Sequence, residues 1–245
     1  MPCVRIVEVL PKPEDLFRAG ADEFVRVGSA AIAEHGRFTV ALSGGSTPRS
    51  LYSLLATSHA DFPWNKTFLF FGDERHVPPD HSDSNYRMVN EALLTKISIP
   101  SANVYRVRAE MRDAAAAAAD YEETLRDFFH LRPGEFPRFD LVLLGLGPDG
   151  HTASLFPDSD GLKEQTRIVI ANWVEKFKTH RITLTYPVLN HATDAMFLVS
   201  GASKADIVHQ IFDAENTPPF PAQQVQPEGR LMWMLDQAAA SKLTR

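Results

Sequence analysis

The sequence has little cysteine: Cys3 is the only one in 245 residues. A single thiol cannot close an intrachain disulfide or supply a multi-cysteine zinc cluster, so we expect a reducing compartment.

Long hydrophobic runs are also missing. The longest, residues 141–146, is far below the roughly 20 apolar residues that cross a bilayer, and residues 1–10 lack the apolar stretch of a signal peptide. We predict a cytoplasmic protein with no membrane partner.

An excess of positive charge is absent as well. Lys and Arg total 25 against 31 Asp and Glu, which gives a net charge of −6. Nucleic-acid-binding domains need a basic surface, so no nucleic-acid partner is expected. A small anionic ligand would require a few cations concentrated at one site, because the field of the whole molecule opposes anions.

What the chain does contain is typical of an α/β protein. Apolar runs without polar alternation predict strands buried on both faces, as in a parallel sheet, at residues 38–42, 67–71, 140–144, 182–185 and 195–199. Residues 15–35 and 113–130 have helical spacing, with Asp113 as an N-cap. We predict one domain over residues 1–245, a doubly wound, mostly parallel sheet with helices on both faces, in a monomer or small homo-oligomer.

The loop after the run 38–42 is a candidate phosphate site. It contains Ser43, Gly44, Gly45, Ser46 and Thr47. Glycines let the backbone approach a ligand, and the helix expected from residue 49 would present free N–H groups. The alternative is a tight turn in which Thr47 caps that helix and nothing binds.

Charged residues follow the next predicted strand, 67–71. Arg75 is a candidate anion ligand, and Asp73 is a candidate for orienting a hydroxyl group or a histidine. The alternative is a solvated loop with internal ion pairs. His76 and His81, with acidic residues nearby, match no metal-binding motif, so we predict no metal.

The segment 145–157 fits the dinucleotide-binding pattern G-x-G-x-x-G literally. That pattern requires a long following helix and an acidic residue about 20 positions further on, but Pro157 would end the helix and the later position is Ile170. We therefore expect no dinucleotide cofactor. His151 remains, with Asp149 two residues before it, as a candidate general base toward water.

Two later positions add candidate cations. Arg181 precedes the run 182–185, and Lys204 opens a helix after the run 195–199. Either could instead face solvent. No G-x-S-x-G pattern is present, so Ser43 and Ser46 have no support as nucleophiles.

Together these segments resemble the 6-phosphogluconolactonase family, whose superfamily includes glucosamine-6-phosphate isomerases and deaminases. The resemblance is carried by residues 43–52, 71–77, 82–88, 144–157, 181–190, 200–205 and 229–240. The isomerases typically have I-A-F-N-E-P after the D-G-H triplet, where this chain has T-A-S-L-F-P, and an aromatic residue where Arg75 stands. These differences favour the lactonases.

The resemblance implies hydrolysis of 6-phospho-D-glucono-1,5-lactone, a small sugar-phosphate lactone, to 6-phosphogluconate without metal or cofactor. It implies that the loop 43–47, Arg75, Arg181 and Lys204 hold the substrate, and that His151 activates water. Asp73 or Asp149 would orient the site, and backbone N–H groups of Gly147 and Gly150 would stabilise the oxyanion. The alternatives are an amino-sugar-phosphate isomerase or deaminase and a non-catalytic sugar-phosphate sensor.

Overall fold

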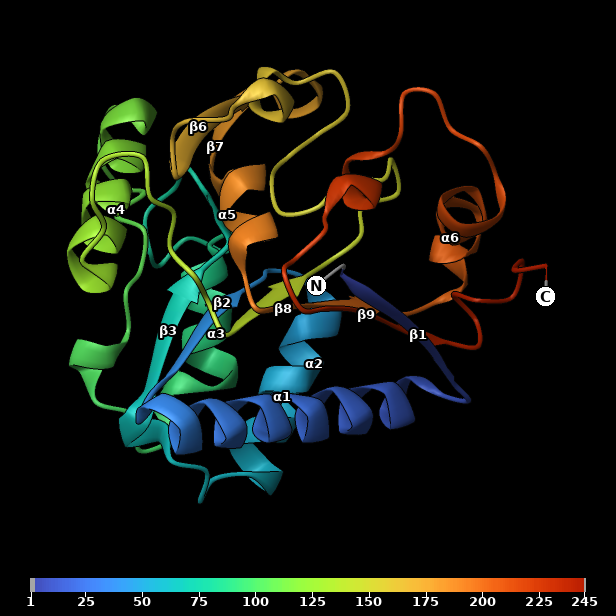
Figure 1. The fold of residues 1–245 in the computed structure, drawn as a ribbon, viewed down its shortest axis with the longest axis horizontal. Helices are drawn as coiled ribbons and strands as arrows, with labels where there is room; N and C mark the ends of the chain where they lie inside the picture. The colour runs from blue at the N-terminus through green and yellow to red at the C-terminus, as the bar shows by residue number, and fades with distance from the viewer. Residues whose placement is uncertain (1–2, 245) are drawn as a thin grey trace.

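A six-stranded parallel sheet forms the centre of the protein (Figure 1). The structure is a computed structural model that describes residues 3–244; the other three residues of the predicted domain 1–245 lie outside the described residues. The strands, in spatial order, are β1 (Val4–Leu10), β9 (Arg230–Asp236), β8 (Asp194–Val199), β5 (Leu141–Leu144), β2 (Phe38–Leu42) and β3 (Thr67–Phe71). Every adjacent pair is parallel. Strands β2, β5 and β8 are buried throughout, which explains their continuous apolar runs.

Helices cover both faces of this sheet, as predicted. On one face lie α1 (Pro13–His35), which contacts β1, β2 and β9, and α2 (Ser46–Ser58), which contacts β8. Figure 1 shows α4 (Ala114–Phe129), α5 (Tyr186–His191) and α6 (Ala205–Asp213) on the other side. The predicted cap of α4 is confirmed, because Asp113 accepts a hydrogen bond from the N–H of Ala115 at 3.0 Å. Within residues 3–244 no helix is long and apolar enough to cross a membrane.

A second, antiparallel sheet was not predicted. Its strands are β4 (Asp73–Arg75), β7 (Thr179–Leu184) and β6 (Val169–Val174), in the order β4-β7-β6. The prediction of a parallel strand at 182–185 is therefore wrong: residues 182–184 end the antiparallel strand β7, and Thr185 is the N-cap of α5. The first three residues of β7 are polar and only half-buried. Arg181 lies inside this strand, directly opposite Arg75. Strand β4 consists of charged residues and forms because β7 pairs with it.

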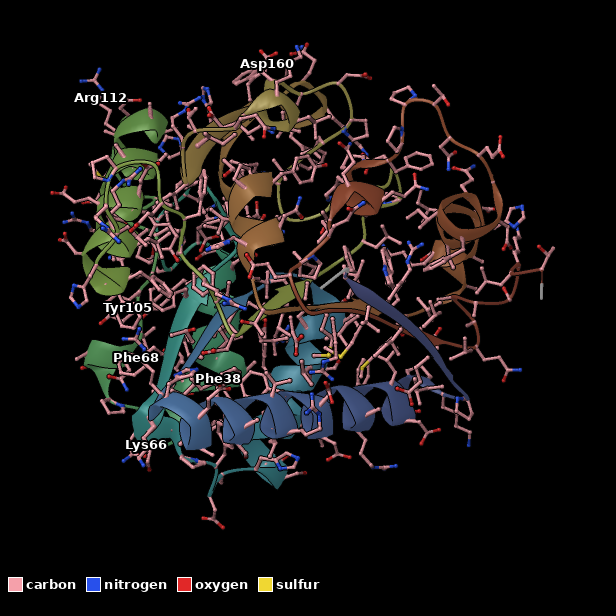
Figure 2. All side chains as sticks on the ribbon, viewed as in Figure 1. Phe38, Lys66, Phe68, Tyr105, Arg112 and Asp160 are labelled. Carbon is pink, nitrogen blue, oxygen red and sulfur yellow. The ribbon has the colours of Figure 1, made fainter. Side chains whose placement is uncertain are left out.

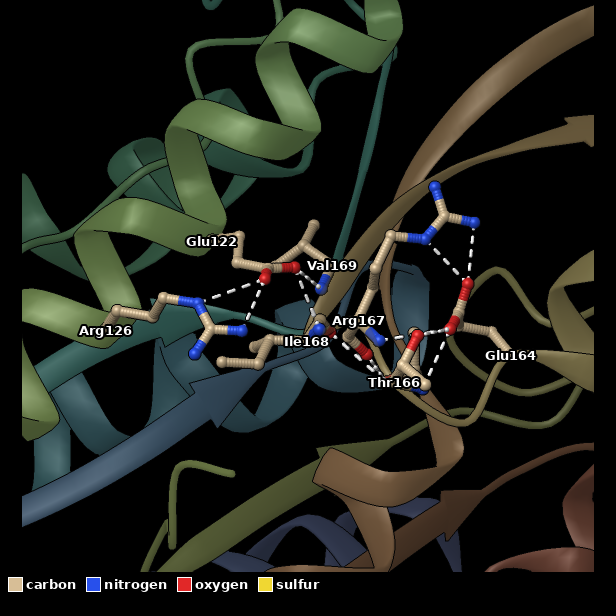
Figure 3. A network of polar contacts seen from close by, with 8 residues as sticks. Glu122, Arg126, Glu164, Thr166, Arg167, Ile168 and Val169 are labelled. Carbon is tan, nitrogen blue, oxygen red and sulfur yellow. Dashed lines mark hydrogen bonds and ion pairs between the residues drawn. The ribbon is translucent and has the colours of Figure 1, made fainter. Parts of the chain in front are cut away.

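One carboxylate fixes the small sheet to α4, and a second orders the turn that precedes it (Figure 3). Glu122 of α4 accepts hydrogen bonds from the N–H groups of Ile168 and Val169, at 2.9 and 3.1 Å. Glu164 accepts from the N–H groups of Thr166 and Arg167, at 2.8 and 3.0 Å. These bonds order the chain that enters β6, and thereby set where the hairpin β6–β7 lies.

Aromatic residues pack around β2 and β3, at the left of Figure 2. Phe38 meets Phe24 of α1 with ring centroids 5.2 Å apart, while Phe68 lies 5.2 Å from Phe128. The chain containing Tyr105 also covers the outer edge of β3, because its N–H donates to the carbonyl of Leu69 at 2.8 Å. This packing gives the loops that follow β2 and β3 a rigid base.

Candidate active site

The site lies where the order in which strands are added to the sheet reverses. Strand β2 has β3 on one side and β5 on the other, so the loops after β2 and β5 diverge and leave a crevice at the carboxyl ends of the strands. A cavity of about 290 Å³ occurs there. Its lining includes Ser43, Gly44, Gly45, Asp73, Arg75, Gly147, His151, Ser154, Phe156, Phe177, Arg181 and Lys204. Most of the predicted site residues are thus brought to one place.

The loop after β2 ends in an open helix N-terminus. Helix α2 begins at Ser46, earlier than predicted, with Gly45 as its N-cap at φ +109° and no side-chain cap. The alternative in which Thr47 caps the helix is therefore wrong. Within residues 3–244 the N–H groups of Ser46 and Thr47 have no hydrogen-bond acceptor, and the hydroxyl of Ser43 is buried without a partner. Such a group of free donors suits an anion.

His151 is held by Asp149 and by an aromatic ring. Its Nδ1 lies 2.5 Å from Oδ1 of Asp149, and its ring stacks on Phe156 with centroids 4.0 Å apart. Burial lowers the pKa of His151, although Asp149 opposes the shift. Burial would raise the pKa of Asp149, but the hydrogen bond and charge of His151 outweigh it and leave that pKa below its usual range. The lowered pKa favours the neutral imidazole, and in that form the contact with Asp149 places the proton on Nδ1 and a lone pair on Nε2.

The predicted oxyanion role of Gly147 and Gly150 does not fit this geometry. The N–H of Gly147 donates to the carbonyl of His151 at 2.8 Å, and that of Gly150 donates to the carbonyl of Gly147 at 3.1 Å. Both donors are used to close the loop. The glycines serve packing instead: a Cβ on Gly147 would lie 1.9 Å from Nδ1 of His151, and Gly150 has φ +76° against the ring of Phe220.

Asp73 has partners that sequence reasoning missed. Its Oδ2 accepts a hydrogen bond from Ser154 at 2.6 Å, and Asn85 donates to its backbone carbonyl at 2.9 Å. Asn85 also packs on Gly44, since a Cβ there would lie 1.9 Å from the amide oxygen. Ser154, Asn85 and Phe156 all fall inside the motif segments, but nothing local distinguishes them. Asp73 thus belongs to a buried network that joins β4 to the start of helix α3 (Asn85–Ala92) and to the loop containing Ser154, while Asp149 is the carboxylate that contacts His151.

The three predicted cations line the cavity without carboxylate partners. Within residues 3–244, Arg75, Arg181 and Lys204 form no ion pair, which rules out the solvated loop with internal pairs. Arg75 donates to the carbonyl of Asp83 at 2.5 Å, and Lys204 to that of Leu146 at 2.6 Å. Nε of Arg181 is buried with no partner.

Arg75 and Arg181 also repel each other. They are directly opposite in the β4–β7 pairing, and like charges in that position are destabilising. Burial, and then the charge of Arg75, lower the pKa of Arg181. Burial also lowers the pKa of Lys204. An anion between these groups would relieve the repulsion, so the cavity is suited to a phosphate.

No group of three or more metal-ligating side chains occurs in the part of the chain that the structure describes. His76 instead approaches the carbonyl of Met111 at 2.7 Å, and His81 lies beside Asp83. Their positions are explained by local contacts.

Known proteins resemble this chain over nearly its whole length. The profile of the family "Glucosamine-6-phosphate isomerases/6-phosphogluconolactonase" matches residues 11–233. A 6-phosphogluconolactonase of Nostoc sp. is 42% identical over 98% of this chain and 99% of its own, and one of Synechocystis sp. is 46% identical over 87% and 88%. The solved 6-phosphogluconolactonase from Trypanosoma cruzi superposes with a TM-score of 0.89 at 31% identity, covering 100% of this chain and 99% of that one. The chain belongs to the glucosamine-6-phosphate isomerase/6-phosphogluconolactonase family.

Proposed function

We propose that the protein hydrolyses 6-phospho-D-glucono-1,5-lactone to 6-phosphogluconate, the second step of the oxidative pentose phosphate pathway. One observation carries the proposal: His151, hydrogen-bonded to Asp149, lines a cavity that also contains three cations without carboxylate partners. A base beside an anion site is what hydrolysis of a phosphorylated lactone requires. The names of the relatives agree with this assignment.

The phosphate group binds at the small sheet. Arg75 and Arg181 approach it from β4 and β7, because only an anion removes their mutual repulsion. The free N–H groups of Ser46 and Thr47 and the Ser43 hydroxyl supply further donors. Lys204 lines the same cavity and holds the charged end of the substrate or its ring oxygens.

The lactone carbonyl is then attacked by water. Nε2 of His151 accepts a proton from the water while Asp149 keeps the other proton on Nδ1. The tetrahedral intermediate collapses with cleavage of the bond to the ring oxygen, and that oxygen takes the proton back from Nε2. With Gly147 and Gly150 engaged and the N–H groups of Ser46 and Thr47 directed to the phosphate, the Lys204 ammonium is the donor proposed for the oxyanion.

The test is an assay on two substrates. Purified protein is given freshly generated lactone, with spontaneous hydrolysis subtracted, and in parallel glucosamine 6-phosphate with ammonia detection. We expect rapid lactone hydrolysis, unchanged by a chelator, and no ammonia. Ammonia release would assign a deaminase instead, and phosphate-ligand binding with turnover of neither substrate would assign a sensor.

A further inference from the structure

The loop that contains His151 is docked along the hairpin β6–β7 (Figure 1). Along the two strands the contacts are buried. Asn172 of β6 donates a hydrogen bond to the carbonyl of Ser154 at 2.8 Å, and the N–H of Ser154 donates to the hydroxyl of Thr183 of β7 at 3.2 Å. Both backbone groups of Ser154 are thus paired with the hairpin, which gives the loop a fixed place on the small sheet.

The tip of the hairpin, residues 175–178, is shaped by its own side chains. Glu175 accepts a hydrogen bond from the indole N–H of Trp173 at 2.8 Å and pairs with Lys178, where the turn closes at φ +50°. These contacts stay within the hairpin. Lys176 and Phe177 instead reach across to the loop that contains His151.

Both of these contacts end on a residue that touches His151. Nζ of Lys176 lies 3.5 Å from Oδ2 of Asp149, whose other oxygen contacts Nδ1 of the imidazole. The ring of Phe177 meets that of Phe156 edge-on, with centroids 6.0 Å apart, and Phe156 in turn stacks on the imidazole. No other lysine or arginine among residues 3–244 pairs with Asp149.

A general base needs such support because it must present one nitrogen in one direction. Asp149 fixes Nδ1 and the ring of Phe156 fixes the plane of the imidazole, so the two together set where Nε2 points. A displacement of about 1 Å near a reacting group can reduce a rate about 10²-fold. The side chain of Asp149 is 30% exposed, so water competes for its second oxygen unless a cation holds it.

We propose that Lys176 and Phe177 are positioning residues for the general base. Lys176 orients Asp149, Phe177 orients Phe156, and the two contacts together fix the direction of Nε2 of His151. This inference rests on the proposed function, in which His151 activates water.

The first experiment distinguishes Lys176 from an ordinary surface lysine. Lys176→Met should lower kcat on the lactone about two- to fivefold with KM unchanged, as expected for the loss of one exposed ion pair, and Lys176→Arg should restore kcat. The matched control is Lys163→Met, because Lys163 also pairs with an aspartate, Asp160, at 3.0 Å but outside the cavity. Its kcat should equal that of wild type.

A double mutant tests whether Lys176 acts through Asp149. Residues that act through one contact have effects that do not add. Lys176→Met should therefore cause no further loss of kcat in an Asp149→Asn background. A wild-type kcat in Lys176→Met, or the same loss with and without the Asp149 carboxylate, would overturn the positioning role of Lys176.

The next variants test whether Phe177 orients Phe156 or only forms a wall of the cavity, which it also lines. Phe177→Ala should lower kcat about two- to tenfold, from loss of one aromatic pair, with KM unchanged. Phe177→Tyr keeps the ring and should remain close to wild type. A raised KM with an unchanged kcat in Phe177→Ala would overturn its positioning role.

An NMR titration of the His151 imidazole tests the Lys176 contact without substrate. Its signals are assigned by their absence in His151→Ala. A nearby cation disfavours protonation of an imidazole, so the midpoint in Lys176→Met should lie at higher pH than in wild type. Lys163→Met should not move it. The other charges that act on His151 are kept in both variants, namely Asp149, Asp73 and Lys204.

The positioning role and the proposed function can fail separately. If wild type does not hydrolyse the lactone, the proposed function is wrong, and the titration still tests whether Lys176 acts on His151. If wild type hydrolyses the lactone but neither kcat nor the titration midpoint changes in Lys176→Met, the positioning role of Lys176 is rejected and the proposed function stands.

Discussion

The two ends of the parallel sheet both carry a cavity, and the larger one is not the candidate site. At the amino ends of the strands a cavity of about 550 Å³ is lined by Arg26, Arg37, Arg138, Arg230 and His35, among others. At the carboxyl ends the volume is about 290 Å³. Each end has several cations and a histidine paired with an aspartate, yet the two differ in how those charges are satisfied.

At the amino end three of the arginines have carboxylate partners, and Arg37 lies over the ring of Phe128. Arg26 pairs with Glu23 at 2.7 Å, Arg138 with Glu228 at 3.2 Å and Arg230 with Glu23 at 2.9 Å. His35 contacts Asp140 at 3.0 Å. At the carboxyl end the cations lack carboxylates and two polar atoms are buried without partners. The comparison teaches that unsatisfied charge, and not cavity size, marks the site that awaits a ligand.

The histidines give the sharpest test of this contrast. His151→Ala should reduce kcat on the lactone by about 10²-fold or more, because a general base is lost, while affinity for inorganic phosphate largely persists. His35→Ala should leave kcat unchanged. Steady-state kinetics with the spontaneous rate subtracted measure both values of kcat. Equal losses of kcat in the two variants would contradict the assignment of His151, and not His35, as the general base.

The arginines come next. Arg181→Gln should raise KM about tenfold or more through loss of charged hydrogen bonds to the phosphate. It should not lower the free energy of unfolding, since it removes repulsion with Arg75. Arg138→Gln, at the other end, should leave KM unaltered and cost under ~1 kcal/mol of stability. A normal KM in Arg181→Gln would show that this arginine does not hold substrate.

The pH profile should reveal the state of His151. Because the neutral imidazole is the active form and burial lowers its pKa, kcat/KM should rise with pH through a pKa below the usual value of histidine. Asp149 raises that pKa, so in Asp149→Asn the acid limb should move to lower pH as kcat falls. An acid limb in wild type above the usual histidine range would contradict the assignment.

The smallest effect concerns the support of the small sheet. Burial opposes ionisation of Glu164, but hydrogen bonds from Thr166 and Arg167 lower its pKa from 4.5 to about 2. Its carboxylate therefore stabilises the fold above pH 4.5, and this contribution is lost as the pH falls toward 2. Glu164→Gln should cost ~1–2 kcal/mol at neutral pH, with the difference shrinking in acid.

Chemical denaturation at several pH values measures this cost. The control is Asp160→Asn, whose carboxylate belongs to an exposed pair with Lys163 and should contribute under ~1 kcal/mol. If the free energy of unfolding of wild type and Glu164→Gln differed by a constant amount across the acid range, ionisation of Glu164 would not contribute to the pH dependence of stability.

The sequence predicted those parts of the molecule whose causes are local. The buried strands β2, β3, β5 and β8 were recognised because strands covered on both faces must be apolar along their length. Since parallel strands end at one edge, the residues after β2 and β5 were expected to converge, and His151 and Ser43 do line one cavity.

The rest depends on pairings distant in sequence. Strand β4 reads as a charged loop, and only β7, more than a hundred residues later, makes it a strand. Strand β1 was missed because it is exposed along most of its length. The engaged N–H groups of Gly147 and Gly150 depend on how the loop folds back on His151, which no spacing rule contains.

The order in which strands are added to the sheet reverses between β2 and β5, and this has a consequence for folding. The cavity takes groups from Ser43, His151 and Lys204, and the last of these arrives only when β8 has paired with β5. A fragment that assembles these groups must therefore span at least residues 43–204. Activity requires the long-range strand pairings of the sheet. We therefore expect turnover to return late in refolding, after the local helices have formed.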